Sequence, residues 1–120
     1  MAKILIVDDD LVNSKIYANK LAAEGCEVVV APDGKSAQKQ ITQKFDLILL
    51  DIMMPKVGGV ALLAEIKKSL NSQTPVIVHT NLTGEEIKKQ CLDLGAKEFL
   101  LKVDLTPNQL MEKIKTYGKI

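Results

Sequence analysis

Acidic residues follow two of the apolar runs in this chain, and their type and spacing indicate a binding site for a cation. Three aspartates follow the run at residues 4–7 and one follows the run at 47–50: Asp8, Asp9, Asp10 and Asp51. Carboxylates a few ångströms apart repel and raise one another's pKa, and a cation relieves that repulsion. Such oxygen ligands suit a hard ion such as Mg²⁺, which needs one or two carboxylates together with waters and a phosphate.

A hydroxyl and an ammonium group follow two later apolar runs. Thr80 comes shortly after the run at 76–78, beside His79 and Asn81, and Lys102 follows the run at 99–101. A lysine neutralises phosphoryl oxygens as a point charge, and a threonine hydroxyl can hydrogen-bond one of them. Each residue alone is ordinary, so only acids, hydroxyl and lysine together indicate a phosphoryl group accompanied by a metal.

Simpler interpretations exist for the same residues. Asp10 is best read as the N-cap of a helix that begins at Leu11. Solvated loop charge is the alternative for Asp8, Asp9 and Asp51, and we favour the metal interpretation because four carboxylates meet near one edge.

The elements that must position these residues alternate in type. Short apolar runs, typical of strands covered on both faces, are separated by amphipathic stretches of helix length such as 11–24 and 59–70; the runs lie at 4–7, 28–31, 47–50, 76–78 and 99–101. Five βα repeats predict a parallel sheet with helices on both faces and right-handed crossovers. Ligands of such sheets bind outside the carboxyl ends of the strands.

Glycines and capping residues mark the helix ends. Gly25 and Gly95 stand where C′ residues are expected. Thr83 with Glu86 predicts a capping box that starts one helix, and Thr106 followed by Pro107 predicts another.

Composition and missing motifs exclude several function classes. The net charge of +1 and four Phe and Tyr residues without Trp argue against nucleic-acid binding. Neither a GxGxxG nor a GxxxxGK[ST] loop is present, and the aspartates at 8–10 would repel a bare phosphate. The chain has one histidine, His79, which excludes metal sites that need two histidine ligands. Cys26 and Cys91 are far apart in the sequence and are expected to be small buried residues of a protein in a reducing compartment. No signal peptide or membrane span is recognisable, so we expect a cytoplasmic protein.

With these residues in order, the chain resembles the receiver domain of bacterial two-component response regulators over essentially all 120 residues. The resemblance rests on five segments taken together: residues 4–9, 49–55, Gly59 with 62–63, 76–80 and 99–102. It implies a flavodoxin-like (βα)5 fold, a doubly wound five-stranded parallel sheet with strand order 2-1-3-4-5. One receiver unit is expected over residues 1–120.

The resemblance also implies a role for each site residue. Asp51 would accept a phosphoryl group from phosphohistidine. Asp9, Asp51 and the backbone carbonyl of Met53 would bind Mg²⁺ or Mn²⁺, with Asp8 supporting the waters of the metal. The other roles implied are phosphoryl contacts for Lys102 and Thr80, and the switch aromatic for Phe99.

Three positions depart from the family pattern. Val103 replaces the proline that usually follows the lysine through a cis bond, and a cis bond before a residue other than proline costs about 2.5–4 kcal/mol. We therefore expect Lys102 on a loop of different shape. Asn81 stands where a small residue is common, and Gly58 stands where an aspartate often caps the third helix.

The resemblance implies a phosphorylation-dependent signalling switch that is not an enzyme beyond its own phosphorylation and dephosphorylation. The donor would be a sensor histidine kinase or phosphotransfer protein. The output would be a changed face of the fourth helix, fifth strand and fifth helix, read by a partner protein, without direct nucleic-acid or membrane contact. The alternatives are a degenerate receiver that binds partners without phosphorylation and, less favoured, an aspartate-nucleophile phosphatase, which would need an acid where Met53 stands.

Overall fold

Strands and helices alternate along the whole chain. The computed structural model describes residues 1–54 and 58–120, so Pro55 of the motif at 49–55 lies outside the described residues. The strands are β1 (Lys3–Val7), β2 (Glu27–Ala31), β3 (Leu47–Leu50), β4 (Val76–Thr80) and β5 (Glu98–Leu101). The helices are α1 (Leu11–Ala23), α2 (Gly34–Gln40), α3 (Gly59–Lys67), α4 (Glu85–Asp93) and α5 (Pro107–Gly118), with the 3₁₀ turn η1 (Lys102–Asp104) after β5.

The five strands form one parallel sheet in the order β2-β1-β3-β4-β5. This confirms the predicted fold class and strand order. Pairing of Val7 with Leu50 and of Thr80 with Leu101 aligns the carboxyl ends of neighbouring strands. The residues that follow these ends therefore meet at one edge, which we call the carboxyl edge.

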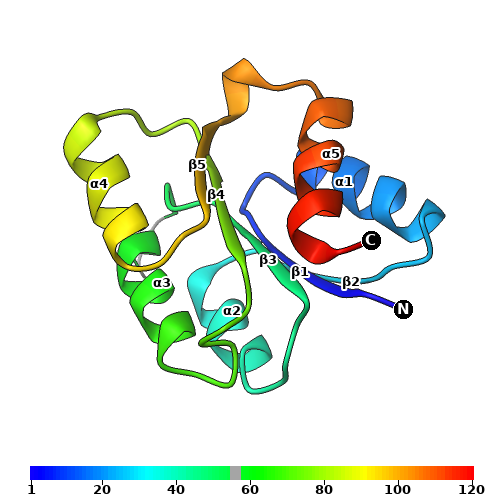
Figure 1. The fold of residues 1–120 in the computed structure, drawn as a ribbon, viewed down its shortest axis with the longest axis horizontal. Helices are drawn as coiled ribbons and strands as arrows, with labels where there is room; N and C mark the ends of the chain where they lie inside the picture. The colour runs from blue at the N-terminus through cyan, green and yellow to red at the C-terminus, as the bar shows by residue number, and fades with distance from the viewer. Residues whose placement is uncertain (55–57) are drawn as a thin grey trace.

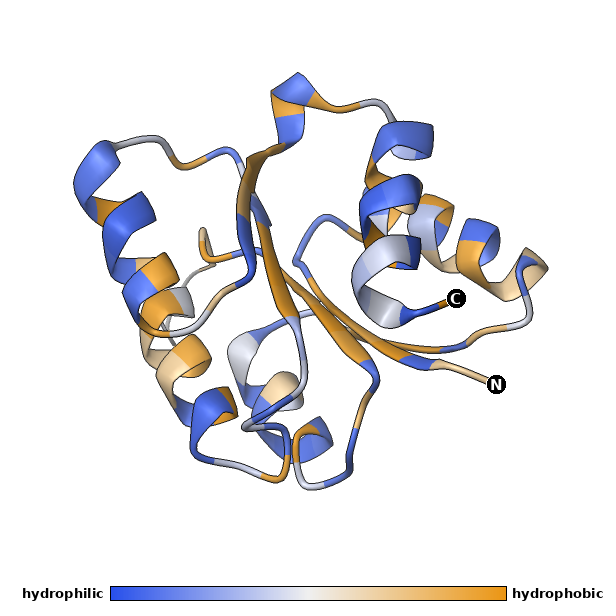
Figure 2. Cartoon of the chain, viewed as in Figure 1, coloured by the Kyte–Doolittle hydropathy of each residue, from blue (hydrophilic) through white to orange (hydrophobic). Residues whose placement is uncertain are grey.

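Helices cover both faces of the sheet (Figure 1). α1 and α5 cover one face, and α2, α3 and α4 cover the other. Each face has its own apolar core: Ile4 and Ile6 point to the α1 and α5 side, whereas Leu5 and Val7 point to the other side. The strands are apolar along most of their length in Figure 2. The central strands β1, β3 and β4 are almost entirely buried, as expected where helices cover both faces, whereas the edge strands β2 and β5 are mostly half-buried.

Most predicted helix boundaries are confirmed by the backbone. The Asp10 side chain accepts a hydrogen bond from Asn13 N–H and caps α1. Thr106 forms the predicted capping box with Gln109 at the start of α5. Gly25 and Gly95 have positive φ just after α1 and α4, and Gly58 is the N-cap of α3 without a side-chain hydrogen bond.

The predicted capping box at Thr83 is wrong. α4 begins at Glu85 with Gly84 as its N-cap, and no side chain caps this end. The φ of Gly84 is +136°, so the backbone turns sharply between Thr83 and the helix. This turn leaves Thr83 outside the position from which its hydroxyl could cap. The predicted helix at 59–70 is also shorter, because α3 ends at Lys67.

Close packing fixes the start of α3 against the loop that follows β3. A Cβ atom on Gly59 would lie 2.2 Å from the Cα atom of Ile52. Only glycine permits this approach, which holds the segment directly after Asp51 against the helix.

A buried side chain joins two loops at the opposite end of the sheet, which we call the amino edge. Asn71 Oδ1 accepts the backbone N–H of Phe45 at 2.8 Å, and its amide nitrogen donates to the carbonyls of Ile41 and Gln43 at 3.2 and 3.0 Å. The Thr74 hydroxyl lies 3.0 Å from both Asn71 Oδ1 and the Phe45 carbonyl. The loop before β3 and the loop before β4 are therefore held by one polar network.

The single histidine belongs to the core. His79 is buried within β4, and its ring meets that of Tyr17 edge-on with centroids 5.7 Å apart. Its Nδ1 atom has no hydrogen-bond partner. Burial, together with the charge of Lys102, lowers the pKa of His79 to about 4.

None of the described helices has both the length and the apolar character that a membrane span requires.

Replacing Asn71 by leucine should destabilise the fold by about 3 kcal/mol, because it leaves the buried Phe45 N–H and two carbonyls without their partner. Chemical denaturation of the native protein and the variant measures this loss. Ser72→Ala, at an exposed neighbour, should stay within about 0.5 kcal/mol of the native protein. Equal stability of both variants would contradict the role given to the network.

The free energy of unfolding should fall as the pH drops from about 6.5 to 4. In this range His79 is protonated in the unfolded state but stays neutral in the folded state. The loss should reach at most about 3 kcal/mol, the free energy of the pKa difference. Comparing the native protein with His79→Leu at each pH isolates this residue, because titrations common to both proteins cancel. A difference in unfolding free energy that stays constant with pH would refute the assignment.

Candidate phosphoryl-transfer site

The carboxyl edge brings the predicted acidic residues together. Asp8 follows β1 and Asp51 follows β3, and these strands are neighbours in the sheet. Carboxylate oxygens of Asp8, Asp9 and Asp51 all lie within 4.8 Å of one another. Asp8 and Asp51 are 3% and 5% exposed, whereas Asp9 is exposed. Simple solvated loop charge therefore does not describe Asp8 or Asp51.

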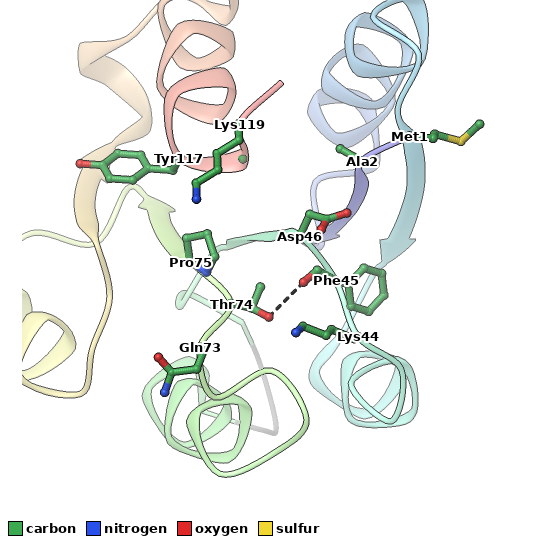
Figure 3. Close-up of a pocket in the computed structure, with 11 residues that line it drawn as sticks. Met1, Ala2, Lys44, Phe45, Asp46, Gln73, Thr74, Pro75, Tyr117 and Lys119 are labelled. Atoms are coloured by element: carbon green, nitrogen blue, oxygen red, sulfur yellow. Dashed lines mark hydrogen bonds between the residues drawn. The ribbon is translucent and has the colours of Figure 1, made fainter.

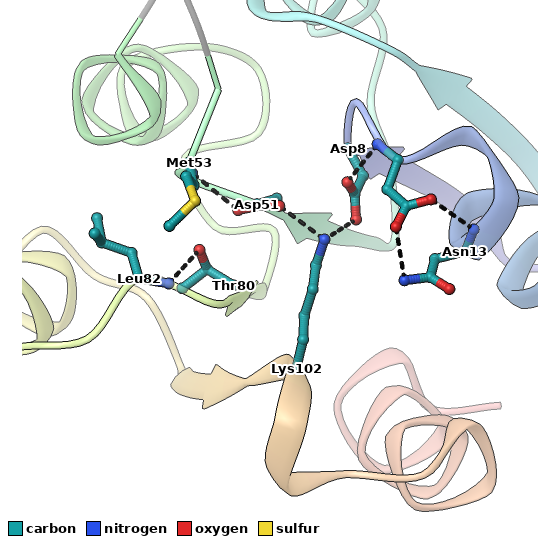
Figure 4. A network of polar contacts seen from close by, with 8 residues as sticks. Asp8, Asn13, Asp51, Met53, Thr80, Leu82 and Lys102 are labelled. Atoms are coloured by element: carbon teal, nitrogen blue, oxygen red, sulfur yellow. Dashed lines mark hydrogen bonds and ion pairs between the residues drawn. The ribbon is translucent and has the colours of Figure 1, made fainter.

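Lys102 joins the two buried carboxylates. Its Nζ atom lies 2.8 Å from Asp8 Oδ2 and 2.8 Å from Asp51 Oδ2, with only 10% of its side chain exposed (Figure 4). The side chain crosses from the end of β5 to reach residues that follow β1 and β3. One ammonium group thus compensates two acids that would otherwise repel each other.

Backbone N–H groups hold the other oxygens. The N–H of Asp10 donates to Asp8 Oδ1 and the N–H of Met53 donates to Asp51 Oδ1, each at 2.9 Å. Both are bonds from residue i+2 to the side chain of residue i, the Asx-turn pattern. Each carboxylate therefore turns one oxygen to its own loop and the other to Lys102.

Burial and charge act in opposite directions on these groups. Burial raises the pKa of Asp8, and the hydrogen bonds from Lys102 and from Asp10 N–H offset only part of that effect. Burial alone would lower the pKa of Lys102. The hydrogen bonds of its ammonium group to Asp51 and Asp8 outweigh burial, so the pKa of Lys102 is raised. The lysine is therefore charged at neutral pH.

The donor set fits a small hard cation. Asp8, Asp9 and Asp51 offer three carboxylates, and Asp9 faces solvent, where a hydrated ion can approach. Oxygen ligands with room for several waters are what Mg²⁺ prefers. No histidine or cysteine belongs to this group, which disfavours a zinc site within the described residues.

The segment that carries Lys102 forms a short helical turn directly after β5. The described residues contain no cis peptide bond, and Lys102, Val103 and Asp104 form the 3₁₀ turn η1. Val103 is exposed, while the lysine side chain points inward. The ammonium group reaches both acids without a proline at position 103.

Thr80 and Phe99 lie on the neighbouring strands. Thr80 is the last residue of β4 and fully buried, and its Oγ1 accepts the N–H of Leu82 at 3.2 Å, again from residue i+2. Phe99 on β5 is half-buried and borders a cavity of about 290 Å³ beside the start of α4. The cavity also contacts Thr83 and Lys88.

The sequence placed the charged residues correctly but missed the groups that orient them. Asp10 is confirmed as a cap, and its backbone N–H also orients Asp8. Met53 contributes a backbone N–H to Asp51, a bond that sequence reasoning did not anticipate. The available signal was the position of each aspartate at a strand end, where Asx turns are frequent.

Comparisons with known proteins agree with this geometry. The family model for the response regulator receiver domain matches residues 4–115. The CpxR homologue of Haemophilus influenzae, a transcriptional regulatory protein, is 37% identical over 96% of this chain and 49% of its own length. CpxR of Escherichia coli is 40% identical over 85% of this chain and 43% of its own. The chain thus spans about half the length of these relatives.

Solved structures show the same similarity. A CheY-like receiver domain protein from Methanospirillum hungatei has a TM-score of 0.92 at 32% identity, with 99% of this chain and 94% of that chain covered. The BeF3-activated receiver domain of Klebsiella pneumoniae RstA has a TM-score of 0.84 at 29% identity, with 98% and 99% covered. The chain belongs to the response regulator receiver domain family, the phosphorylation-dependent signalling switches of two-component systems.

Proposed function

We propose that residues 1–120 form one receiver unit that accepts a phosphoryl group on Asp51. The observation that carries this proposal is the position of Lys102 between Asp8 and Asp51, at 2.8 Å from each. A buried carboxylate with a fixed cation beside it is held ready for an incoming phosphoryl group, whose charge the same cation can meet.

The proposed reaction is one displacement at phosphorus. An oxygen of Asp51 forms the new P–O bond while the P–N bond of a phosphohistidine breaks, and the imidazole leaves with the electron pair. Catalysis of this kind is positioning and charge stabilisation. Met53 N–H fixes one oxygen of Asp51, and Lys102 then pairs with phosphoryl oxygens.

A divalent cation completes this proposal. Asp9, Asp51 and the Met53 carbonyl would hold Mg²⁺ or Mn²⁺, and Asp8 would hold its waters. When bound, the ion supplies positive charge to the phosphoryl oxygens. Asp8 and Asp51 share one ammonium group between them, which leaves negative charge at the site to attract the ion.

Thr80 and Phe99 would convert phosphorylation into a changed surface. Thr80 would leave Leu82 N–H and turn its hydroxyl to a phosphoryl oxygen. Phe99 would then move inward and alter the face made by α4, β5 and α5, where the cavity beside its ring lies. A downstream protein would read this face.

The surface around Asp51 supports a protein as the phosphodonor. Five of the nine large apolar side chains that are exposed in the described residues lie in segments around the site: Leu11, Val12, Ile16, Met53 and Val103. A sensor histidine kinase or phosphotransfer protein would bury them as it brings its phosphohistidine to Asp51. Neither nucleic acid nor membrane is a partner in this proposal.

Two other functions are less well supported. A degenerate receiver would need no ordered Lys102 bridge, yet both contacts are present. An aspartate-nucleophile phosphatase would need a second acid where Met53 stands. We therefore propose a switch that acts on its own aspartyl phosphate and turns over no separate substrate.

Incubation with acetyl phosphate and Mg²⁺ should add a single phosphoryl group to the native protein, as measured by intact mass. The Asp51→Asn variant should gain no phosphoryl group, because the side-chain amide of asparagine does not attack phosphorus. Asp46→Asn, at an exposed acid of the amino edge, should label like the native protein. Labelling of Asp51→Asn at the native level would contradict the proposed acceptor.

Fluoroberyllate with Mg²⁺ should shift the side-chain NMR resonances of Phe99, because it mimics the phosphoryl group that draws Thr80 inward. Thr80→Ala should still accept phosphate from acetyl phosphate but lose most of the Phe99 shift, whereas Thr80→Ser should keep it. An unchanged Phe99 shift in Thr80→Ala would show that the hydroxyl does not couple the two sites.

A further inference from the structure

A hollow of about 540 Å³ lies at the amino edge, at the opposite end of the strands from Asp51. It is formed by the loops before β3 and β4 and by the end of α5 (Figure 3). Its polar lining includes Lys44, Asp46, Gln73, Thr74 and Lys119. The site around Asp51 does not extend to this end of the molecule.

Four lysines surround the segment at 73–76 beside this hollow. Lys44 and Lys119 line the hollow, and in Figure 3 their ammonium groups point toward Thr74 and Pro75. Lys67 Nζ donates to the Thr74 carbonyl at 2.8 Å. The backbone N–H of Lys97 donates to the Val76 carbonyl at 2.8 Å, which places this residue next to the same segment.

Of the described side chains that line the hollow, Lys44 and Lys119 are cations and Asp46 is an acid. Within the residues that the structure describes, none of the four lysines forms an ion pair. Asp46, the acid of the hollow, accepts the backbone N–H of Lys3 at 2.7 Å. Burial and the charge of Lys97 lower the pKa of Lys67, as expected where cations face one another.

Helix ends explain only part of this arrangement. Lysines in a last helical turn are stabilised by the helix dipole, and this accounts for Lys67 at the end of α3. The same effect acts on Lys119 at the end of α5. Lys44 and Lys97 lie in loops, where no such effect acts, and Lys44 lines the hollow together with Lys119.

The backbone at Lys119 ends helix α5. Its φ of 56° makes it the one residue other than glycine with a left-handed backbone in the described part of the chain. Helices commonly end on a residue with this backbone, and its N–H donates to the carbonyl of Lys115. The cap places the side chain of Lys119 at the hollow, into which it points in Figure 3.

We propose that this hollow binds a small oligophosphate anion, either free or as the phosphate chain of a nucleotide. Lysines bind phosphates as point charges, and the volume lies within the range of small-molecule sites. Lys44 and Lys119 hold the anion from two sides, and Lys67 and Lys97 add to the positive field. The site is independent of Asp51 and of the proposed phosphorylation.

Titration of the labelled protein with inorganic triphosphate in EDTA, followed by NMR, tests the proposal, because without metal the acidic carboxyl edge repels the anion. We expect saturable shifts at the amides of Lys44, Gln73 and Lys119 and none at Asp51. The double variant Lys44→Gln/Lys119→Gln should bind about tenfold more weakly. The control Lys15→Gln/Lys35→Gln removes equal charge from exposed positions elsewhere and should change the affinity by less than about twofold.

ATP in place of triphosphate distinguishes the two sources. Equal affinity means that only phosphates are recognised, and tighter binding of ATP means that the nucleoside adds contacts; both outcomes support the site. The proposal is overturned by the absence of saturable shifts up to about 10 mM for both anions, or by equal weakening in the control variant.

Discussion

One ammonium group between two buried carboxylates determines how the carboxyl edge is built. Asp8 and Asp51 follow adjacent parallel strands, so the topology of the sheet alone places them side by side. Two buried carboxylates without a cation between them would repel each other and destabilise the folded protein. Lys102 removes that cost, and it does so from a third strand end, which ties the ends of β1, β3 and β5 into one unit.

The same local bond repeats at three strand ends. Asp8, Asp51 and Thr80 each accept the backbone N–H of the residue two positions later, at 2.9, 2.9 and 3.2 Å. These bonds set the direction of each side chain before any ligand arrives. Preorganisation of this kind is what phosphoryl transfer requires, because little else remains for the protein to do.

Sequence reasoning reached the architecture because apolar runs and their spacing decide it locally. The run at 47–50 forms β3, and the acid that follows it, Asp51, lies close to Asp8 and Asp9. The prediction of a helix cap at Thr83 was wrong although the capping pattern is present in the sequence. The backbone turns at Gly84, whose φ is +136°, and α4 begins at Glu85. Sequence reasoning also could not foresee that Lys102 bridges two acids without a phosphoryl group, since that contact depends on three segments distant in the chain. The roles of the site residues remain predictions: Asp8, Asp9, Asp51, Met53, Thr80, Phe99 and Lys102.

The hydrogen bond from Leu82 N–H to Thr80 has a thermodynamic consequence for the resting protein. A neutral hydrogen bond of this kind contributes about 0.5–1.5 kcal/mol. Losing this bond without a replacement partner therefore lowers the population of the alternative Thr80 rotamer by roughly twofold to thirteenfold. In the proposed switch, this bond would therefore act as a bias against the alternative Thr80 rotamer in the unphosphorylated protein.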